Sequence, residues 1–205
     1  ATEAFIGYTE YATSVIADRK ADPKEDLMSV LCHAEVDGDV LTHDELVHES
    51  LLILIGGDET TRHVISGGAW QLLADRRQWD LLAADPTKLT VGIEEMLRWV
   101  TPIKNMNRTA TRDVVVGGQQ IHEGDNVLLL YPSANRDEDV FDDPFRFDVE
   151  RTPNDHVAFG FGTHFCLGNS LARLELRVMF EQLLARLPDL ELVSPEEPAY
   201  RAANF

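Results

Sequence analysis

The segment FGFGTHFCLG, residues 159–168, decides how this chain folds. Its three glycines let the backbone turn where other residues cannot and let it approach a bulky ligand closely. Cys166 lies just before a predicted helix that runs from about Asn169 to Leu187. At the start of a helix, unpaired N–H groups and the positive end of the helix dipole favour a thiolate over a thiol. The segment therefore predicts a cysteine held by the backbone for a purpose.

Such a cysteine suits the axial position of a haem iron, because a thiolate among apolar rings donates electron density to the metal. The alternative for a single cysteine is an inert, buried thiol in a turn. The segment also matches F-x-x-G-x-[HR]-x-C-x-G, the signature of the cytochromes P450, at every fixed position. The chain resembles that family, and the resemblance implies haem b as the cofactor and Cys166 as the iron ligand. Phe159, Gly160 and Gly168 are expected to contact the haem.

A second motif, GGDETT at residues 56–61, interrupts a long apolar helix predicted to begin at the capping box Thr42–Glu45. Each mid-helix glycine costs about 1 kcal/mol relative to alanine. One interpretation is a close helix–helix contact at the glycines, with the polar residues in solvent. The other is that the motif resembles the oxygen-activating segment [AG]-G-x-[DE]-T-[TS] of the P450 family. That resemblance implies that Thr60 hydrogen-bonds the bound dioxygen, Glu59 helps relay protons, and Gly57 lies where the helix bulges beside the haem.

A third motif places Glu95 and Arg98 at i and i+3 on one face of the predicted helix Leu89–Val100. An isolated E-x-x-R of this kind is common on helix surfaces. In this order along the chain it resembles the E-x-x-R of the P450 family, where the pair is buried and completed by an arginine of a later P-x-R-F segment. Here that segment is Pro144–Phe147, so Arg146 is the predicted third member. A network of three satisfies buried charges that a pair leaves unsatisfied.

Haem carries two carboxylates that need cationic or hydrogen-bonding partners. The resemblance implies that Arg108, His164 and His156 fill this role, although each alone would be an ordinary polar group. Arg173 and Arg177, four residues apart on the last helix, are either a basic docking patch for a redox partner or solvated arginines.

The wording of LLILIGGDETTRH, EEMLRW and FGFGTHFCLGN is similar to that of actinobacterial P450 enzymes that hydroxylate the terminus of a sterol side chain. The resemblance implies a substrate such as cholesterol or cholest-4-en-3-one, with ferredoxin and ferredoxin reductase as electron donors. Ile55, Ile103 and Met106 are the expected substrate-facing residues.

Several alternatives remain open at this point. The substrate can be another lipid or a terpenoid. The reaction can be that of a peroxygenase or of a nitric-oxide-reducing relative, although the intact Glu59–Thr60 pair argues for oxygen activation. The chain can be a non-catalytic haem-binding fragment, and a thiol or zinc protein built on Cys166 and His164 would need more ligands than the chain offers.

Composition excludes several classes of function. The chain has 205 residues, is 44% hydrophobic and 26% charged, and carries a formal net charge of −18, with 36 acidic and 18 basic residues. Such a charge repels nucleic acid and anionic membranes. No apolar run reaches the roughly 18 residues of a membrane span, so no membrane anchor is expected in this segment. Two cysteines make no disulfide framework, which favours a reducing, cytoplasmic compartment.

The expected fold is mainly α with a minor β component. Helices are predicted near residues 5–19, 27–35, 43–74, 76–84, 89–100 and 169–187, with two or three strands between 113 and 130. The resemblance implies that residues 1–205 are the carboxy-terminal, haem-binding part of a single P450 domain, with more chain expected before residue 1 and after residue 205.

Overall fold

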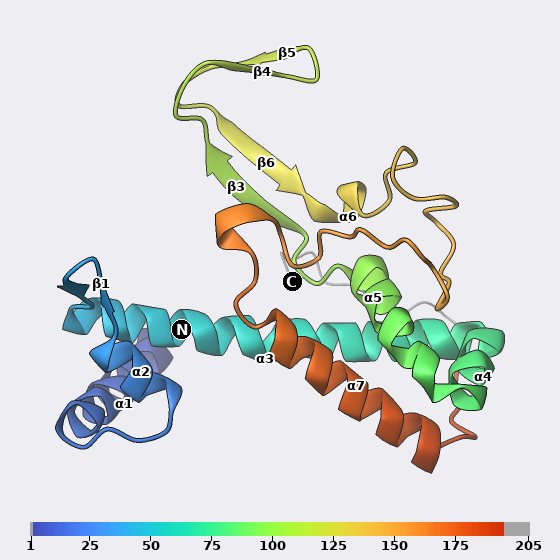
Figure 1. Cartoon of the computed structure of the whole chain (residues 1–205), viewed down its shortest axis with the longest axis horizontal. Coiled ribbons are helices and arrows are strands. Elements are labelled where there is room, and N and C mark those ends of the chain that lie inside the picture. Colours follow the sequence, from blue (N-terminus) through green and yellow to red (C-terminus); the bar gives the residue numbers. More distant parts are fainter. Residues whose placement is uncertain (1, 195–205) are drawn as a thin grey trace. The chain divides into compact units, whose positions relative to one another are not determined.

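A computed structural model describes residues 2–194 and shows mostly helices, with small sheets (Figure 1). The sheets within this range are three antiparallel pairs, β1–β2, β3–β6 and β4–β5. The expected fold class, mainly α with minor β, is confirmed. None of the described helices is long and apolar enough to cross a membrane. The chain divides into two compact units, residues 1–58 and the residues from 59 onward.

The first unit forms around a small apolar core of Ala12, Ile16, Leu46 and Val47. Its elements are α1 (Thr2–Ala21), α2 (Leu27–His33), β1 (Glu35–Val36), β2 (Asp39–Val40) and the first part of α3 (His43–Ala74). The predicted capping box at the start of α3 is confirmed. The Thr42 amide donates to Glu45 Oε2 at 2.8 Å, and the Glu45 amide donates to Thr42 Oγ1 at 3.3 Å.

The second unit contains the rest of α3 and all later elements. These are α4 (Arg76–Ala84), η1 (Pro86–Lys88), α5 (Leu89–Val100), β3 (Asn105–Thr109), β4 (Val114–Val116), β5 (Gln119–Ile121), β6 (Asn126–Leu130), α6 (Tyr131–Ala134), η2 (Gly162–His164) and α7 (Asn169–Arg186). The bounds of α4 and α5 agree with the predicted ones. Figure 1 shows β3 and β6 as a ribbon with β4–β5 at its far end. Strand β3 was not predicted, because NMNRT lacks the alternation of a half-buried strand, and its partner β6 makes it a strand.

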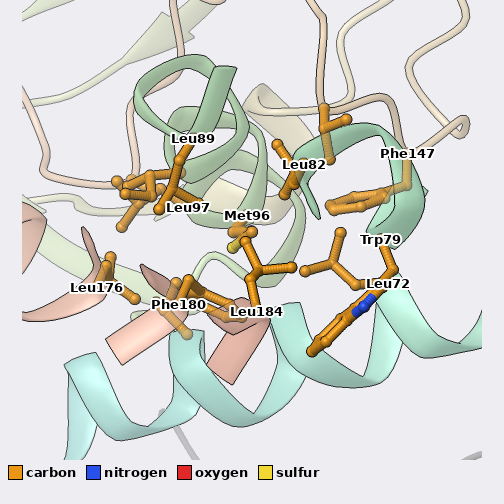
Figure 2. Packing of buried hydrophobic residues seen from close by; sticks show 14 residues of the cluster. Leu72, Trp79, Leu82, Leu89, Met96, Leu97, Phe147, Leu176, Phe180 and Leu184 are labelled. Atoms are coloured by element: carbon orange, nitrogen blue, oxygen red, sulfur yellow. The ribbon is translucent and has the colours of Figure 1, made fainter. Parts of the chain in front are cut away.

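The core of the second unit gathers side chains from α3, α4, α5, α7 and the loop before η2. Figure 2 shows Met96 of α5 among the leucines and aromatic rings of the other elements. The buried members are Val64, Leu72, Trp79, Leu82, Leu89, Ile93, Met96, Leu97, Phe147, Val149, Ala158, Leu176, Phe180 and Leu184. Helix α5 contributes four of them and is therefore the centre of the packing.

Two glycines of α3 allow it to pack closely on α5. A Cβ atom added at Gly67 would lie 2.8 Å from Val100 Cγ2, and one added at Gly68 would lie 2.9 Å from Met96 Sδ. At Gly56 and Gly57, by contrast, an added Cβ would meet no described atom within 4 Å. The close helix contact considered for the GGDETT motif thus occurs eleven residues further along the helix, at the second glycine pair.

We predict that Gly67→Ala lowers the free energy of unfolding by about 1–3 kcal/mol, because Val100 is β-branched and cannot move aside cheaply. Gly57→Ala is the matched control, and it should be neutral or stabilising by up to about 1 kcal/mol. Urea denaturation followed by circular dichroism measures both. Equal stability of the two variants would show that the Gly67 contact is not tight.

Candidate functional site

The backbone of residues 159–166 closes into a turn around the cysteine. The Cys166 amide donates to the carbonyl oxygen of Phe159 at 3.0 Å, and the Phe165 amide donates to that of Gly162 at 3.0 Å. Gly160 and Gly162 have φ angles of 72° and 75°, in the left-handed region that favours glycine. The glycines of this segment are therefore required by the turn that presents Cys166.

Cys166 is partly exposed and its sulfur is in no disulfide. Among residues 2–194 the sulfur has no hydrogen-bond partner, while both backbone groups of Cys166 are bonded. Helix α7 begins three residues later, at Asn169, whose side-chain amide donates to the Cys166 carbonyl oxygen at 2.8 Å. The fold thus holds the backbone of Cys166 and leaves its thiol available.

Large apolar side chains flank the thiol in the same loop and are exposed. Phe161 is 89% exposed and Leu167 is 82% exposed, and Phe165 is about half exposed. Exposed apolar groups gathered in one segment mark a surface that binds an apolar partner. No group of three or more His, Cys, Asp or Glu side chains in the described part of the chain could hold a metal ion by protein ligands alone.

Two of the predicted carboxylate partners have no carboxylate partner within the described residues. The side chain of Arg108, on β3, donates to the backbone oxygen of the adjacent Asn107 at 2.8 Å and forms no ion pair there. The His164 ring, in η2, makes no hydrogen bond or ion pair with any described residue. Met106 and Arg108 are two residues apart on β3 and so share a face of the ribbon.

The third predicted partner, His156, is engaged elsewhere. Its ring is buried, and Nε2 bonds Glu94 Oε2 at 3.0 Å. The Ala158 amide donates to Nδ1 at 3.2 Å, so Nδ1 carries no proton and Nε2 is the donor to Glu94. In this structure the donor of His156 is therefore used by Glu94 and not by a haem carboxylate, the role expected from the resemblance.

Arg173 shares Glu94 with His156. Its Nε and Nη2 donate to the two Glu94 oxygens at 2.7 and 2.9 Å. Burial would raise the pKa of the Glu94 carboxyl, but the hydrogen bonds from Arg173 and His156 outweigh it and lower that pKa to about 2. Arg173 is thus bound within the protein, which contradicts a free docking arginine at this position. Arg177 is more exposed and lies 3.7 Å from Glu181.

The predicted E-x-x-R pair is fully buried in α5. Arg98 Nε and Nη2 donate to the Glu95 oxygens at 2.7 and 2.8 Å, and both residues are 0% exposed. The remaining Arg98 donors bond backbone oxygens of the loop after α6. These oxygens belong to Asn135 at 2.8 Å, Pro144 at 2.9 Å and Arg146 at 3.2 Å. A bidentate pair of this kind is the strongest form of such a contact.

The third member of the network is Arg151 and not Arg146. Arg151 Nε lies 3.1 Å from Glu95 Oε2, with its side chain 9% exposed. The Arg146 guanidinium is 64% exposed and lies 3.3 Å from Asp148 instead. The prediction of Arg146 is wrong, because the loop turns its carbonyl oxygen, and not its side chain, toward Arg98 and Arg151.

Asn135 is a further buried residue of this scaffold that the sequence did not single out by function. Its Nδ2 donates to Thr101 Oγ1 at 2.9 Å, and its Oδ1 accepts from the Val157 amide at 2.8 Å. Asn135 therefore links the end of α5 to the segment that leads into the cysteine turn. Only the ANRD wording of this segment signalled it in the sequence.

The GGDETT segment is α-helical throughout, so the expected bulge at Gly57 is not present. Glu59 is partly exposed and is paired with Arg62 and with His63, the latter at 3.8 Å. Thr60 is partly buried. Of the expected substrate-facing residues, Ile55 and Met106 are about half exposed and Ile103 is partly buried.

Comparisons with known proteins decide the family. The family model of the cytochromes P450 matches residues 87–198. The chain belongs to the cytochrome P450 family. A steroid C26-monooxygenase of Mycolicibacterium smegmatis is 56% identical over 203 residues, which are 99% of this chain and 51% of that protein. One of Mycobacterium tuberculosis is 57% identical over 204 residues, again 99% of this chain and 51% of that protein.

Solved P450 structures share this fold. A crystal structure of CYP109E1 from Bacillus megaterium in complex with testosterone superimposes with a TM-score of 0.93 at 35% identity, covering 100% of this chain and 57% of that one. The chain spans about half the length of the curated relatives it matches. The described fold is thus that of the corresponding part of a cytochrome P450.

The P450 family implies haem b, and the donor set around Cys166 fits it. Haem needs a ligand to iron, an apolar surface against its ring and partners for two carboxylates. The turn offers the thiol of Cys166, which has neither a disulfide nor a hydrogen-bond partner among the described residues, with exposed Phe161 and Leu167. Arg108 and His164 are cations or donors without a carboxylate among the described residues.

We predict that Arg151→Ala lowers the free energy of unfolding by about 3–5 kcal/mol, because it leaves part of the buried charge of Glu95 uncompensated. Arg146→Ala, two-thirds exposed and five residues away, should change it by less than about 0.5 kcal/mol. Chemical denaturation of both variants tests the assignment. A larger loss in Arg146→Ala would restore the P-x-R-F arginine as the third member.

Proposed function

We propose that the protein is a haem-thiolate monooxygenase in which Cys166 ligates the iron. The observation that carries this proposal is the cysteine turn, which bonds both backbone groups of the partly exposed Cys166 and leaves its sulfur without a hydrogen-bond partner among the described residues. The bound haem would activate dioxygen, so that one oxygen atom enters an apolar substrate and the other leaves as water. Phe159, Gly160 and Gly168 shape the turn beside it, and Arg108 and His164 would pair with its carboxylates.

Residues of α3 would supply and transfer the protons that this reaction consumes. Forming water from one oxygen atom consumes two protons in a site that excludes solvent, so donors must be supplied by the protein. The carboxylate of Glu59 is partly exposed, and it can exchange protons with solvent while Arg62 and His63 keep it in place. Thr60 is the next residue, and its hydroxyl would pass a proton toward the substrate side. Gly57, whose added Cβ would meet no described atom, leaves room beside the helix.

The substrate we propose is a steroid such as cholesterol or cholest-4-en-3-one, hydroxylated at the end of its side chain. Relatives that are 56–57% identical over 99% of the chain carry the name steroid C26-monooxygenase. Ile55, Ile103 and Met106 supply apolar surface that suits such a molecule. We further propose a cytoplasmic enzyme that receives electrons from ferredoxin and ferredoxin reductase. Hydroxylation of another lipid is the second candidate, because a methyl-branched lipid omega-hydroxylase of Mycobacterium tuberculosis is 43% identical over 197 residues.

The first prediction concerns the iron ligand. The haem-loaded protein, reduced with dithionite and exposed to carbon monoxide, should give a strongly red-shifted Soret band. Cys166→Ala should abolish that band, whereas Cys32→Ala, at the other free cysteine, should retain it. A thiolate band that persists in Cys166→Ala would refute the assignment. A blue-shifted band in all three proteins would mean haem bound without a thiolate.

The second prediction concerns the substrate. Titration with cholest-4-en-3-one should shift the Soret band of the oxidised, haem-loaded protein to shorter wavelength. Met106→Asp should weaken binding about tenfold or more, since a carboxylate replaces apolar contact worth about 1.4 kcal/mol. Val115→Asp, at an exposed apolar position of β4, is the matched control. A larger shift with a branched fatty acid than with the steroid would favour the second candidate.

A further inference from the structure

We infer that Arg173 is a positioning residue for the iron ligand: its guanidinium fixes the peptide groups on both sides of Cys166 and is itself fastened to α5 by Glu94. This inference deepens the proposed function and rests on Cys166 as the ligand. It replaces the interpretation of Arg173 as a docking residue, which its contacts contradict.

The first step concerns the amide side of Cys166. The Cys166 N–H donates to the carbonyl oxygen of Phe159 at 3.0 Å. The guanidinium carbon of Arg173 lies 4.7 Å from the centroid of the Phe159 ring, a distance at which a cation is attracted to an aromatic face. Phe159 also packs against the core of the second unit. Arg173 therefore covers the residue that accepts the Cys166 amide and holds its ring against the core.

The second step concerns the carbonyl side. Asn169 Nδ2 donates to the Cys166 carbonyl oxygen at 2.8 Å. The same side chain presents Oδ1 to Arg173 Nη1 at 2.9 Å. Because a primary amide has one accepting and one donating end, the bond from Arg173 determines which end faces Cys166. Without Arg173, Asn169 loses the bond that holds its Oδ1 and is less firmly kept against the Cys166 carbonyl oxygen.

The third step is the anchor. Arg173 Nε and Nη2 donate to the two oxygens of Glu94, and His156 Nε2 bonds Oε2 of the same carboxylate. A planar guanidinium with fixed donors can serve Glu94, Asn169 and the Phe159 ring at once, which a lysine ammonium cannot. Glu94 and Glu95 are adjacent in α5. Glu95 bonds the loop that precedes the cysteine turn, and Glu94 bonds Arg173, which contacts the turn itself.

Arg177 provides a matched control. It lies one helical turn after Arg173 on α7, is about half exposed and pairs with Glu181 at 3.7 Å, and it contacts neither Phe159 nor Asn169 in the described structure. Substitution at Arg177 alters the charge of the same helix surface without touching the cysteine turn.

The test compares Arg173→Met, Arg173→Lys and Arg177→Met with the unaltered protein. In the haem-free chain, hydrogen exchange of residues 159–168 is measured by mass spectrometry, with exchange in α4 as the measure of overall folding. In the haem-loaded protein, the carbon monoxide difference spectrum and the rate of reduction by ferredoxin are recorded. We expect both Arg173 variants to exchange faster in residues 159–168 and to convert the red-shifted band to a blue-shifted one sooner. Arg177→Met should leave both unchanged.

Two outcomes overturn the inference. Unchanged exchange and spectra in Arg173→Met, with slower reduction by ferredoxin that Arg173→Lys restores, would make Arg173 a docking residue. Faster exchange in α4 together with residues 159–168 would make it a general stabilising residue. Glu94→Gln checks this in a second variant, because it keeps one acceptor oxygen for Arg173 and replaces the other with a donor. If the unaltered protein lacks the thiolate band, the proposed function fails. The exchange data still test whether Arg173 holds residues 159–168 in place.

Discussion

A buried, permanently charged guanidinium is the constraint on which this structure depends. Arg98 is fully excluded from solvent, so every one of its donors must find an acceptor inside the protein. Glu95 satisfies part of this demand, and three carbonyl oxygens of an otherwise irregular loop satisfy the rest. The loop is therefore held in place without regular secondary structure, because its carbonyl oxygens are bonded to the buried guanidinium of Arg98. The cysteine turn directly follows this loop in the chain, so the bonds to Arg98 also help to fix where the turn begins.

Helix α5 carries this organisation through neighbouring residues. Glu95 faces Arg98 and Arg151, and Glu94 faces His156 and Arg173, so the two carboxylates serve different segments. Adjacent positions of a helix point about 100° apart, which allows one helix to hold two segments at once. Hydrophobic residues of the same helix fill the core of the second unit. The helix is thus buried on nearly all sides, and its charged residues Glu94, Glu95 and Arg98 bond the segments that lead to Cys166 or follow it.

Much of the fold could be predicted from the sequence, because it follows from local rules. The capping box at Thr42, the proline-free stretch of α3 and the stop before Pro102 gave helix bounds close to the observed ones. The glycine pattern correctly indicated the turn around Cys166. The partners of buried charged residues were harder to predict from the sequence. Arg146 and Arg151 lie in one loop, and only its three-dimensional course decides which side chain reaches Glu95. The same holds for His156, whose use depends on Glu94, 62 residues away.

Helix α3 contains two glycine pairs of opposite character. At Gly67 and Gly68 any side chain would collide with α5, whereas Gly56 and Gly57 face open space within the described structure. A larger side chain at Gly56 or Gly57 can therefore alter what fits beside the helix without loosening the core. In the proposed enzyme, substitutions at residues 56 and 57 would change what binds beside one end of the helix while the other end preserves the fold, which makes these two residues a natural starting point for redesign.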